Sequence, residues 1–260
     1  MAVDGWIACI AAFAVWLAGC LGGLVLVRRR ASPASLRQHH DIAGIIYAAV
    51  AVVYAVLLAF VAVVAWERHE AVETHAAKEA AALVDLYRAT NGMPPDDAGA
   101  LRAALRNYVR MVIDDEWVAL ARGERSALTD SAVAAMWRAY LTVDPVGEGE
   151  RIWLAEAIDR LGESGEERQL RLLGARRTIP GPLWLVLLLG AAITVAFSFL
   201  LAAPSGVLHG VMVVLLSSAI GLVLLLVFAF QKPFSGPVRV EPTAFIEAMA
   251  AFEAWDRFGR

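Results

Sequence analysis

Residues 42–66 read IAGIIYAAVAVVYAVLLAFVAVVAW, a run of 25 residues without Asp, Glu, Lys or Arg. A helix of about 20 apolar residues crosses the roughly 30 Å hydrocarbon core of a bilayer, since each residue adds about 1.5 Å. Three further apolar runs without these charged residues cover residues 6–27, 183–203 and 207–230. The sequence therefore predicts an all-α integral membrane protein with four transmembrane helices.

The four runs come in two pairs, and a charged segment separates the pairs. Residues 67–177 hold 20 acidic and 15 basic side chains, in a stretch long enough to form a small core of its own. We therefore expect four parts along the chain. They are transmembrane helices one and two (1–66), a helical extramembrane domain inserted between spans two and three (67–181), a transmembrane hairpin of helices three and four (182–230), and a Pro-rich segment with an amphipathic C-terminal helix (231–260).

The second apolar run has no helix stop at its end. From Trp66 the chain continues without Pro or Gly as far as Thr90, where the sequence NGMPP follows at residues 91–95. Pro and Gly at such a position end helices. We therefore predict one rod over residues 43–90, about 70 Å long, which would couple membrane and domain mechanically.

The charged segment also has apolar residues at helical spacing. Helices are predicted over residues 97–122, 126–141 and 150–174, and the Gly-Glu-Ser-Gly sequence at 162–165 is a candidate break in the last one. Residues 243–258 repeat large apolar side chains in the same way. This tail predicts an amphipathic helix that lies on the membrane, on the helical domain or on a neighbouring subunit.

The first apolar run is interpreted as a retained helix rather than a cleaved signal peptide. No positive region precedes it, it covers about 22 residues rather than the 7–15 of a signal-peptide core, and Arg28-Arg29-Arg30 follows it instead of a cleavage site. The run also holds Cys9 and Cys20. Eleven residues along a helix correspond to about 16 Å, so these two cysteines cannot bridge each other.

The arginines after the first run decide the predicted orientation. Four arginines fall within residues 28–41, whereas the N-terminal flank of the run carries only Asp4. By the positive-inside rule this loop is cytoplasmic. The N-terminus and the helical domain are then expected outside the cytoplasm, in a multi-pass protein of the inner (cytoplasmic) membrane. Basic residues before the third run and in the C-terminal tail oppose this orientation, but long domains translocate largely regardless of charge.

Motifs of enzymes are missing from the sequence. There is no Walker-type phosphate loop, no dinucleotide-binding Gly-x-Gly-x-x-Gly after a strand, no His-Glu-x-x-His and no Gly-x-Ser-x-Gly. The spans also lack the Asp, Glu, Lys or Arg that proton-relay transporters use. We expect neither an enzyme nor a cofactor, and the net negative charge of the central segment gives no reason to expect nucleic acid.

Two His–Glu pairs on the predicted rod are candidate metal ligands. His69 and Glu73 are four residues apart, as are His75 and Glu79, so each pair shares a helix face. Each pair supplies only two ligands, and such contacts are common on solvated helices. We therefore favour ordinary side-chain contacts on a solvated helix face over a metal site.

Several short motifs follow one another after the second span. They are Glu79-Ala80, Leu86-Tyr87-Arg88, Tyr108, Glu116-Trp117, Arg168 with Arg171, Pro233-Phe234-x-Gly236, and Pro242. In their order and spacing, and with the four spans, they make the chain resemble a bacterial bestrophin-like membrane protein family, a four-span domain of unknown function. Residues before Pro-Phe in that family are often acidic, whereas this chain has Gln231-Lys232.

The resemblance implies a function by analogy of architecture. Bestrophins are pentameric anion channels with four spans per subunit, so it implies a homo-oligomeric ion channel in the lipid bilayer whose other partners are inorganic ions. The second span would line the pore, with Tyr47, Tyr54 and Phe60 as candidate neck residues. It also implies a cytosolic helical domain, against the orientation expected from the arginines. The alternative is a non-conducting sensor or scaffold whose helical domain binds a partner or ligand, and a strict monomer would favour it.

Overall fold

The computed structural model describes residues 2–30, 40–176, 178–201 and 205–258. Every regular element within these residues is helical, and no strand occurs in them. The all-α prediction is therefore confirmed for the described part of the chain.

The chain forms two compact units. The membrane unit consists of Met1–Glu67, Thr178–Lys232 and Gly236–Val238. The helical unit consists of Arg68–Arg177, Pro233–Ser235 and Arg239–Arg260. Each unit is therefore assembled from segments that lie far apart in the sequence.

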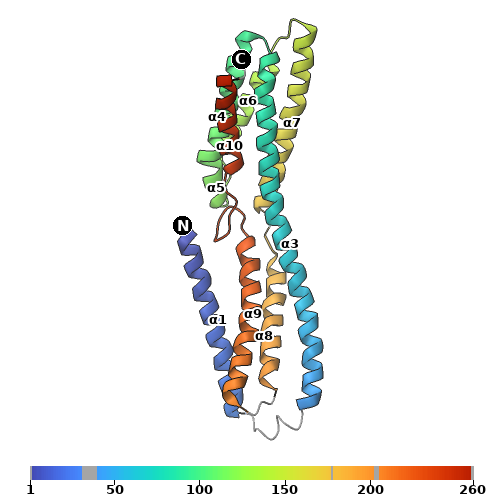
Figure 1. Ribbon diagram of the computed structural model, residues 1–260, viewed down its shortest axis with the longest axis vertical. Helices are drawn as coiled ribbons and strands as arrows, with labels where there is room; N and C mark the ends of the chain where they lie inside the picture. The colour runs from blue at the N-terminus through green and yellow to red at the C-terminus, as the bar shows by residue number, and fades with distance from the viewer. Residues whose placement is uncertain (1, 31–39, 177, 202–204, 259–260) are drawn as a thin grey trace. The chain divides into compact units, whose positions relative to one another are not determined.

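The membrane unit contains the helices that are long and apolar enough to cross a bilayer, four of them among the described residues (Figure 1). They are α1 (Ala2–Arg30), the first part of α3 (His40–Ala89), α8 (Gly181–Phe199) and α9 (Gly206–Phe230). The prediction of four helices of spanning length is confirmed. Residues 202 and 203 of the third apolar run lie outside the described residues.

Side chains from all four of these helices form the core of the membrane unit. Leu187 and Ala191 of α8 are fully buried at its centre. Around them lie Cys20 and Leu24 of α1, Tyr54, Leu58 and Val61 of α3, and Val213, Ile220, Leu224 and Val227 of α9. Cys9 and Cys20 are both free thiols, in agreement with the distance expected between them along one helix.

Helix α3 is continuous over 50 residues, from His40 to Ala89. At about 1.5 Å per residue it is roughly 75 Å long, and the prediction of a single rod is confirmed. A 3₁₀ turn (Thr90–Gly92) and Pro94 then separate it from α4 (Pro95–Met111). The apolar first half of α3 belongs to the membrane unit, and the half that starts at Arg68 belongs to the helical unit.

The helical unit is completed by shorter helices. After α4 come one π-helical turn, η2 (Val112–Glu116), then α5 (Trp117–Ala121), α6 (Ala127–Leu141), α7 (Glu148–Arg176) and α10 (Thr243–Phe258). The sequence predicted one regular helix over 97–122, and the π turn is the difference. Ser126 caps α6, since its hydroxyl accepts the N–H of Thr129 at 2.9 Å.

The predicted break at residues 162–165 is wrong, because α7 continues through it. A glycine inside a helix costs only about 1 kcal/mol relative to alanine. Leu161 and Ser164 are buried on the face of α7 that packs into the unit. Arg160 also bonds Glu156 and Glu163 along the helix, each at 2.9 Å. Packing and these pairs outweigh the weak helix propensity of the two glycines.

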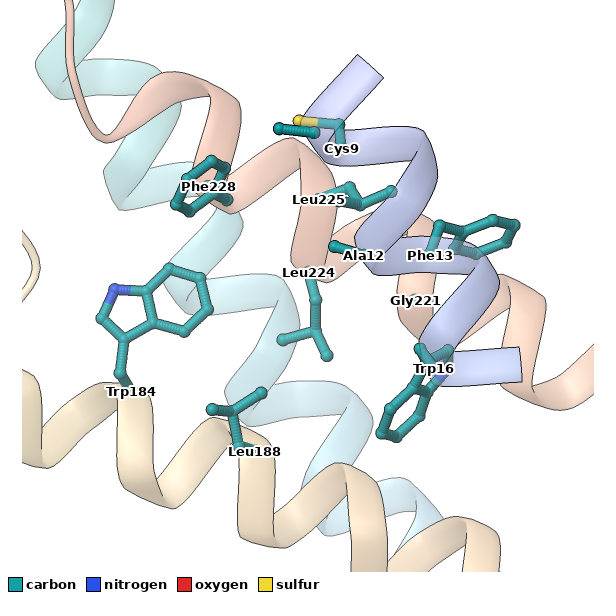
Figure 2. Close-up of a pocket in the computed structure, with 11 residues that line it drawn as sticks. Cys9, Ala12, Phe13, Trp16, Trp184, Leu188, Gly221, Leu224, Leu225 and Phe228 are labelled. Atoms are coloured by element: carbon teal, nitrogen blue, oxygen red, sulfur yellow. The ribbon is translucent and has the colours of Figure 1, made fainter. Parts of the chain in front are cut away.

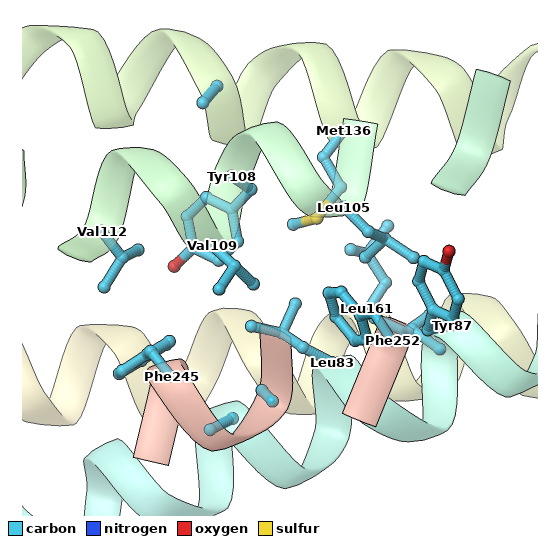
Figure 3. Close-up of a cluster of buried hydrophobic side chains, with 14 of the residues drawn as sticks. Leu83, Tyr87, Leu105, Tyr108, Val109, Val112, Met136, Leu161, Phe245 and Phe252 are labelled. Atoms are coloured by element: carbon cyan, nitrogen blue, oxygen red, sulfur yellow. The ribbon is translucent and has the colours of Figure 1, made fainter. Parts of the chain in front are cut away.

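Figure 3 shows the apolar core of the helical unit. Leu83 and Tyr87 of α3, Leu105 of α4 and Leu161 of α7 are buried together. The C-terminal helix α10 closes this core, because its Phe252 ring stacks on the Tyr87 ring with centroids 4.1 Å apart. Of the three surfaces considered for this amphipathic helix, α10 therefore covers the helical unit.

Candidate functional site

The three pore-lining candidates of α3 lie in two different environments. Tyr54 is buried in the membrane unit, and its hydroxyl donates to the Leu187 carbonyl of α8 at 3.1 Å. Tyr47 is half-buried, and its ring centroid lies 6.1 Å from that of Phe197, also on α8. Phe60 is 68% exposed. Within this chain, the two tyrosines therefore pack against α8, whereas Phe60 is exposed.

A glycine sets how closely α3 approaches α8. A Cβ atom at Gly190 would lie 2.5 Å from the ring of Tyr54, which is far inside van der Waals contact. Small residues allow such close helix packing in membranes, where no hydrophobic effect drives helices together. The position of the Tyr54 face of α3 therefore depends on the missing side chain at Gly190.

The face of α3 that carries Phe60 is apolar, exposed and free of charge. Its large exposed side chains between residues 42 and 66 are Ile42, Ile45, Ile46, Val52, Val53, Val56, Phe60, Val63, Val64 and Trp66. This stretch contains no acidic or basic residue. In one copy of the chain, these side chains are exposed, although Trp66 at the end of the face lies edge-on against Phe230 of α9 with ring centroids 5.2 Å apart.

A buried network of charged side chains occupies the helical unit. Arg171 of α7 donates from Nε to Glu79 Oε2 of α3 at 2.8 Å and from Nη2 to Glu116 Oε2 at 2.7 Å. The neighbouring Arg168 bonds the other oxygen of Glu116 and reaches Asp130 Oδ1 of α6 at 2.9 Å. Arg171 and Glu79 are fully buried. The network therefore ties α3, η2, α6 and α7 together.

Glu116 and Trp117 are neighbours in the sequence, and both lie in this core at the end of the π turn. Consecutive residues of an α-helix point about 100° apart, and a π turn is wider than an α-helical one. The Arg171 guanidinium lies 5.0 Å from the Trp117 ring centroid and 5.3 Å from that of Phe245, within the range of cation–π attraction.

Burial and neighbouring charges shift the protonation of this network in opposite directions. Burial raises the pKa of Glu79, and Arg171 opposes that rise. Burial also holds the pKa of Tyr108, whose hydroxyl donates to Glu79, well above its usual value. At Asp130, burial is outweighed by hydrogen bonds from Arg168 and Arg125, and the pKa is lowered. Buried charges of this kind are costly unless they are paired, so the two arginines and the carboxylates depend on each other.

The structure gives the residues of the two candidate metal pairs different surroundings. His75 Nδ1 lies 2.6 Å from Glu167 Oε2 of α7, whereas Glu79 bonds Arg171 and Tyr108. His69 is buried, and burial lowers its pKa while the exposed Glu73 acts in the opposite direction. Among the described residues, no group of three or more His, Cys, Asp or Glu side chains could hold a metal ion.

The C-terminal motif belongs to a loop with several fixed contacts in the helical unit. Phe234 is buried edge-on against Trp117, with ring centroids 5.1 Å apart. The Pro233 carbonyl accepts the N–H of Val240 at 2.7 Å, and the Trp117 indole N–H donates to the Val240 carbonyl at 3.0 Å. Gly236 has φ +113°, which residues with a Cβ rarely adopt.

Sequence reasoning did not predict that these motif residues converge. Glu79, Glu116 and Arg171 come from three segments and meet in one network, and Asp130 joins them from a fourth. A usable signal existed in their spacing. Arg168 and Arg171 follow Leu161 at helical intervals, so they occupy positions of α7 where a buried apolar residue is expected.

Comparisons with known proteins agree with this architecture. A family model described as "Bestrophin-like domain" matches residues 14–245. Among solved structures, the chain is similar to a mutant of a bacterial bestrophin homologue from Klebsiella pneumoniae, at 13% sequence identity and a TM-score of 0.71. That match covers 95% of this chain and 99% of the other. No curated protein matches the chain in sequence.

Proposed function

Because this chain belongs to the bestrophin-like family, we propose that several copies of it assemble into a membrane ion channel that conducts anions. The proposal assigns the pore to α3 of each subunit. Four spans in a single copy are too few to enclose an aqueous pore, so the function requires a homo-oligomer. The lipid bilayer, further copies of the chain and inorganic ions are the partners that this function needs.

The observation that carries the proposal is the exposed face of α3 around Phe60. Its side chains are apolar, and the stretch from 42 to 66 has no charged residue. Apolar constrictions gate pores by excluding water, without any charged side chain. In a ring of subunits such faces would meet around a central axis, with Phe60 at the neck. Tyr47 and Tyr54 of α3, the other two pore-lining candidates, would then hold this helix against α8 through their contacts with Phe197 and Leu187.

The remaining parts of the proposal concern organisation. The segment of residues 67–181 acts as an inserted helical domain between two pairs of spans, and the unbroken α3 transmits the motion of this domain to the pore.

Arg28, Arg29 and Arg30 end α1, and they support an orientation in the inner membrane with the N-terminus and helical domain outside the cytoplasm. Labelling of a cysteine at exposed Val146 in intact cells by an impermeant thiol reagent tests this orientation, and protection from the reagent would reverse it.

Anion flux from proteoliposomes tests the function. With a proton ionophore present to compensate charge, liposomes that hold potassium chloride should release chloride but not potassium, and Phe60→Ala should raise the rate. The shorter side chain removes an apolar barrier, and a barrier lowered by about 1.4 kcal/mol gives roughly a tenfold faster rate. Leu215→Ala on α9 is the matched control, because Leu215 is also exposed in the membrane unit, at 65%.

The outcomes of the flux measurement separate the two functions. Flux that rises in Phe60→Ala and stays unchanged in Leu215→Ala supports a pore at α3. Equal effects of the two substitutions would place the pore elsewhere. Absence of flux for either ion, from a protein that remains folded, would favour a sensor or scaffold whose helical unit binds a partner.

A further inference from the structure

An apolar pocket lies between α1, α8 and α9 in the membrane unit (Figure 2). Its volume is about 420 Å³, within the range of small-molecule sites. Small residues of α1, such as Cys9 and Ala12, form one side of the pocket. Trp184 of α8 and Phe228 of α9 form the opposite side, with ring centroids 6.4 Å apart.

The polar groups of the pocket walls are already bonded. The indole N–H of Trp184 donates to Gln231 Oε1 at 2.7 Å, and that of Trp16 donates to the Ser217 carbonyl at 2.9 Å. The other lining side chains are aliphatic, aromatic or the Cys9 thiol. Such a cavity does not bind water or a polar ligand, since neither would gain hydrogen bonds there.

We infer that this pocket binds an acyl chain of a membrane phospholipid. All three of its helices are of spanning length and apolar composition, so the medium around the pocket is hydrocarbon. The Trp184 and Trp16 indoles are held by their hydrogen bonds, and Gly221 of α9 leaves room for the Phe13 ring of α1, because a Cβ atom at Gly221 would lie 2.9 Å from that ring. The inference does not require the chain to conduct ions.

The charge at one end of the pocket favours an anionic headgroup. Gln231, the partner of Trp184, directly follows α9, and Lys232 is the next residue along the chain. Lys232 is exposed, and no acidic side chain lines the pocket among the described residues. The proposal therefore assigns the phosphate of such a lipid to the Lys232 side chain.

Photo-cross-linking with a phosphatidylglycerol that carries a diazirine on its acyl chain tests the inference. The full chain is reconstituted in nanodiscs, irradiated and mapped by peptide mass spectrometry. We expect labels on the peptides that contain Cys9–Trp16, Trp184 and Leu224–Phe228, and competition by unlabelled phosphatidylglycerol. Phosphatidylcholine should compete less well, and Lys232→Gln should remove that difference.

Two substitutions on α1 make the test specific. Ala12→Phe fills the pocket and should reduce the competed labelling at least about tenfold, the change that corresponds to 1.4 kcal/mol of binding free energy. Ala14→Phe places the same side chain two positions on, roughly 160° around the helix, at an exposed residue outside the pocket. It should leave the labelling unchanged.

Three results would overturn the inference. One is labelling that unlabelled lipid does not compete with, as for lipid that merely surrounds the protein. Another is an equal loss of labelling in Ala12→Phe and Ala14→Phe. The third is a cross-link from the pocket residues to a second copy of the chain, which would make the pocket a subunit interface. Melting temperatures of both variants equal to that of the natural protein show that none of these results comes from misfolding.

Discussion

Arg171 and Arg160 lie on the same helix and differ mainly in burial. Arg171 is fully buried between Glu79 and Glu116, whereas the Arg160 side chain is 42% exposed beside Glu156 and Glu163. Burying a charge is tolerated only with its partners in place, whereas an exposed ion pair contributes little. The stability of the helical unit should therefore depend on Arg171 far more than on Arg160.

Arg171→Ala should destabilise the folded protein by about 3–5 kcal/mol, because it leaves Glu79 buried without its cation and Glu116 with Arg168 alone. Arg160→Ala, the matched control on α7, should change the melting temperature only slightly. Thermal unfolding of both variants in detergent, followed by circular dichroism, provides the measurement. Equal shifts for the two variants would show that the buried network does not stabilise the helical unit.

The stability of the helical unit should depend on pH through Asp256 of α10. It accepts a hydrogen bond from the Tyr87 hydroxyl at 2.8 Å and pairs with Arg106 and Arg102 of α4. Burial acts to raise its pKa, but these hydrogen bonds and charges outweigh burial, and the pKa lies below the ordinary value of 3.8. The folded state therefore favours the ionised form, and α10 gains stability from it above the unfolded pKa.

This stability should be lost as the pH falls from about 4, where the unfolded chain begins to take up the proton, through the lower folded pKa. Between pH 7 and 5 it should be constant. The melting temperatures of the natural protein and Asp256→Asn, compared from pH 7 to 3, test this. The variant should be less stable at pH 7, and the difference should shrink below pH 4. A difference that stays constant over the whole range would contradict the assigned role of Asp256.

At the scale of elements, the contact between α3 and α8 depends on Gly190. A side chain there would meet the Tyr54 ring at 2.5 Å, and overpacking of this kind costs about 1–3 kcal/mol. Gly190→Ala should lower the melting temperature, and Tyr54→Ala in the same chain should recover part of the loss. Gly210→Ala on α9 is the control, since a Cβ atom there has no neighbour within 4 Å. No difference between the two glycine variants would contradict this packing.

The elements best predicted from sequence are those whose secondary structure follows from a single physical requirement. A backbone in hydrocarbon must satisfy its own hydrogen bonds, so the charge-free runs could be predicted as helices. The amphipathic spacing of residues 243–258 likewise predicted α10, whose bounds are Thr243–Phe258. The surface that α10 covers could not be predicted, because the spacing shows which face is apolar but not what lies against it.

The elements missed depend on tertiary packing. The glycines at 162 and 165 suggested a break in α7, but the buried face of that helix keeps it continuous. The π turn at Val112–Glu116 has no comparable signal in the sequence. Glu116 lies four residues after buried Val112, so helical spacing puts both on one face, but that spacing does not identify Arg171 of α7 as the partner of Glu116.

At the scale of the whole molecule, the central claim is that several copies share one pore lined by α3. The exposed apolar face around Phe60 and the membership of the bestrophin-like family both support it. A pore at a shared axis cannot exist in a single copy. The oligomeric state therefore tests the shared pore without any assumption about which ion it conducts. Closed rings of identical subunits also give one discrete mass rather than a ladder of masses.

The mass of the natural protein in nanodiscs, measured by native mass spectrometry, is the most direct test. We expect one species at a fixed whole multiple of the 28.0 kDa chain, large enough for a ring, such as five copies. A monomer or a simple dimer as the sole species would contradict the shared pore, and with it the assignment of α3 as the pore helix.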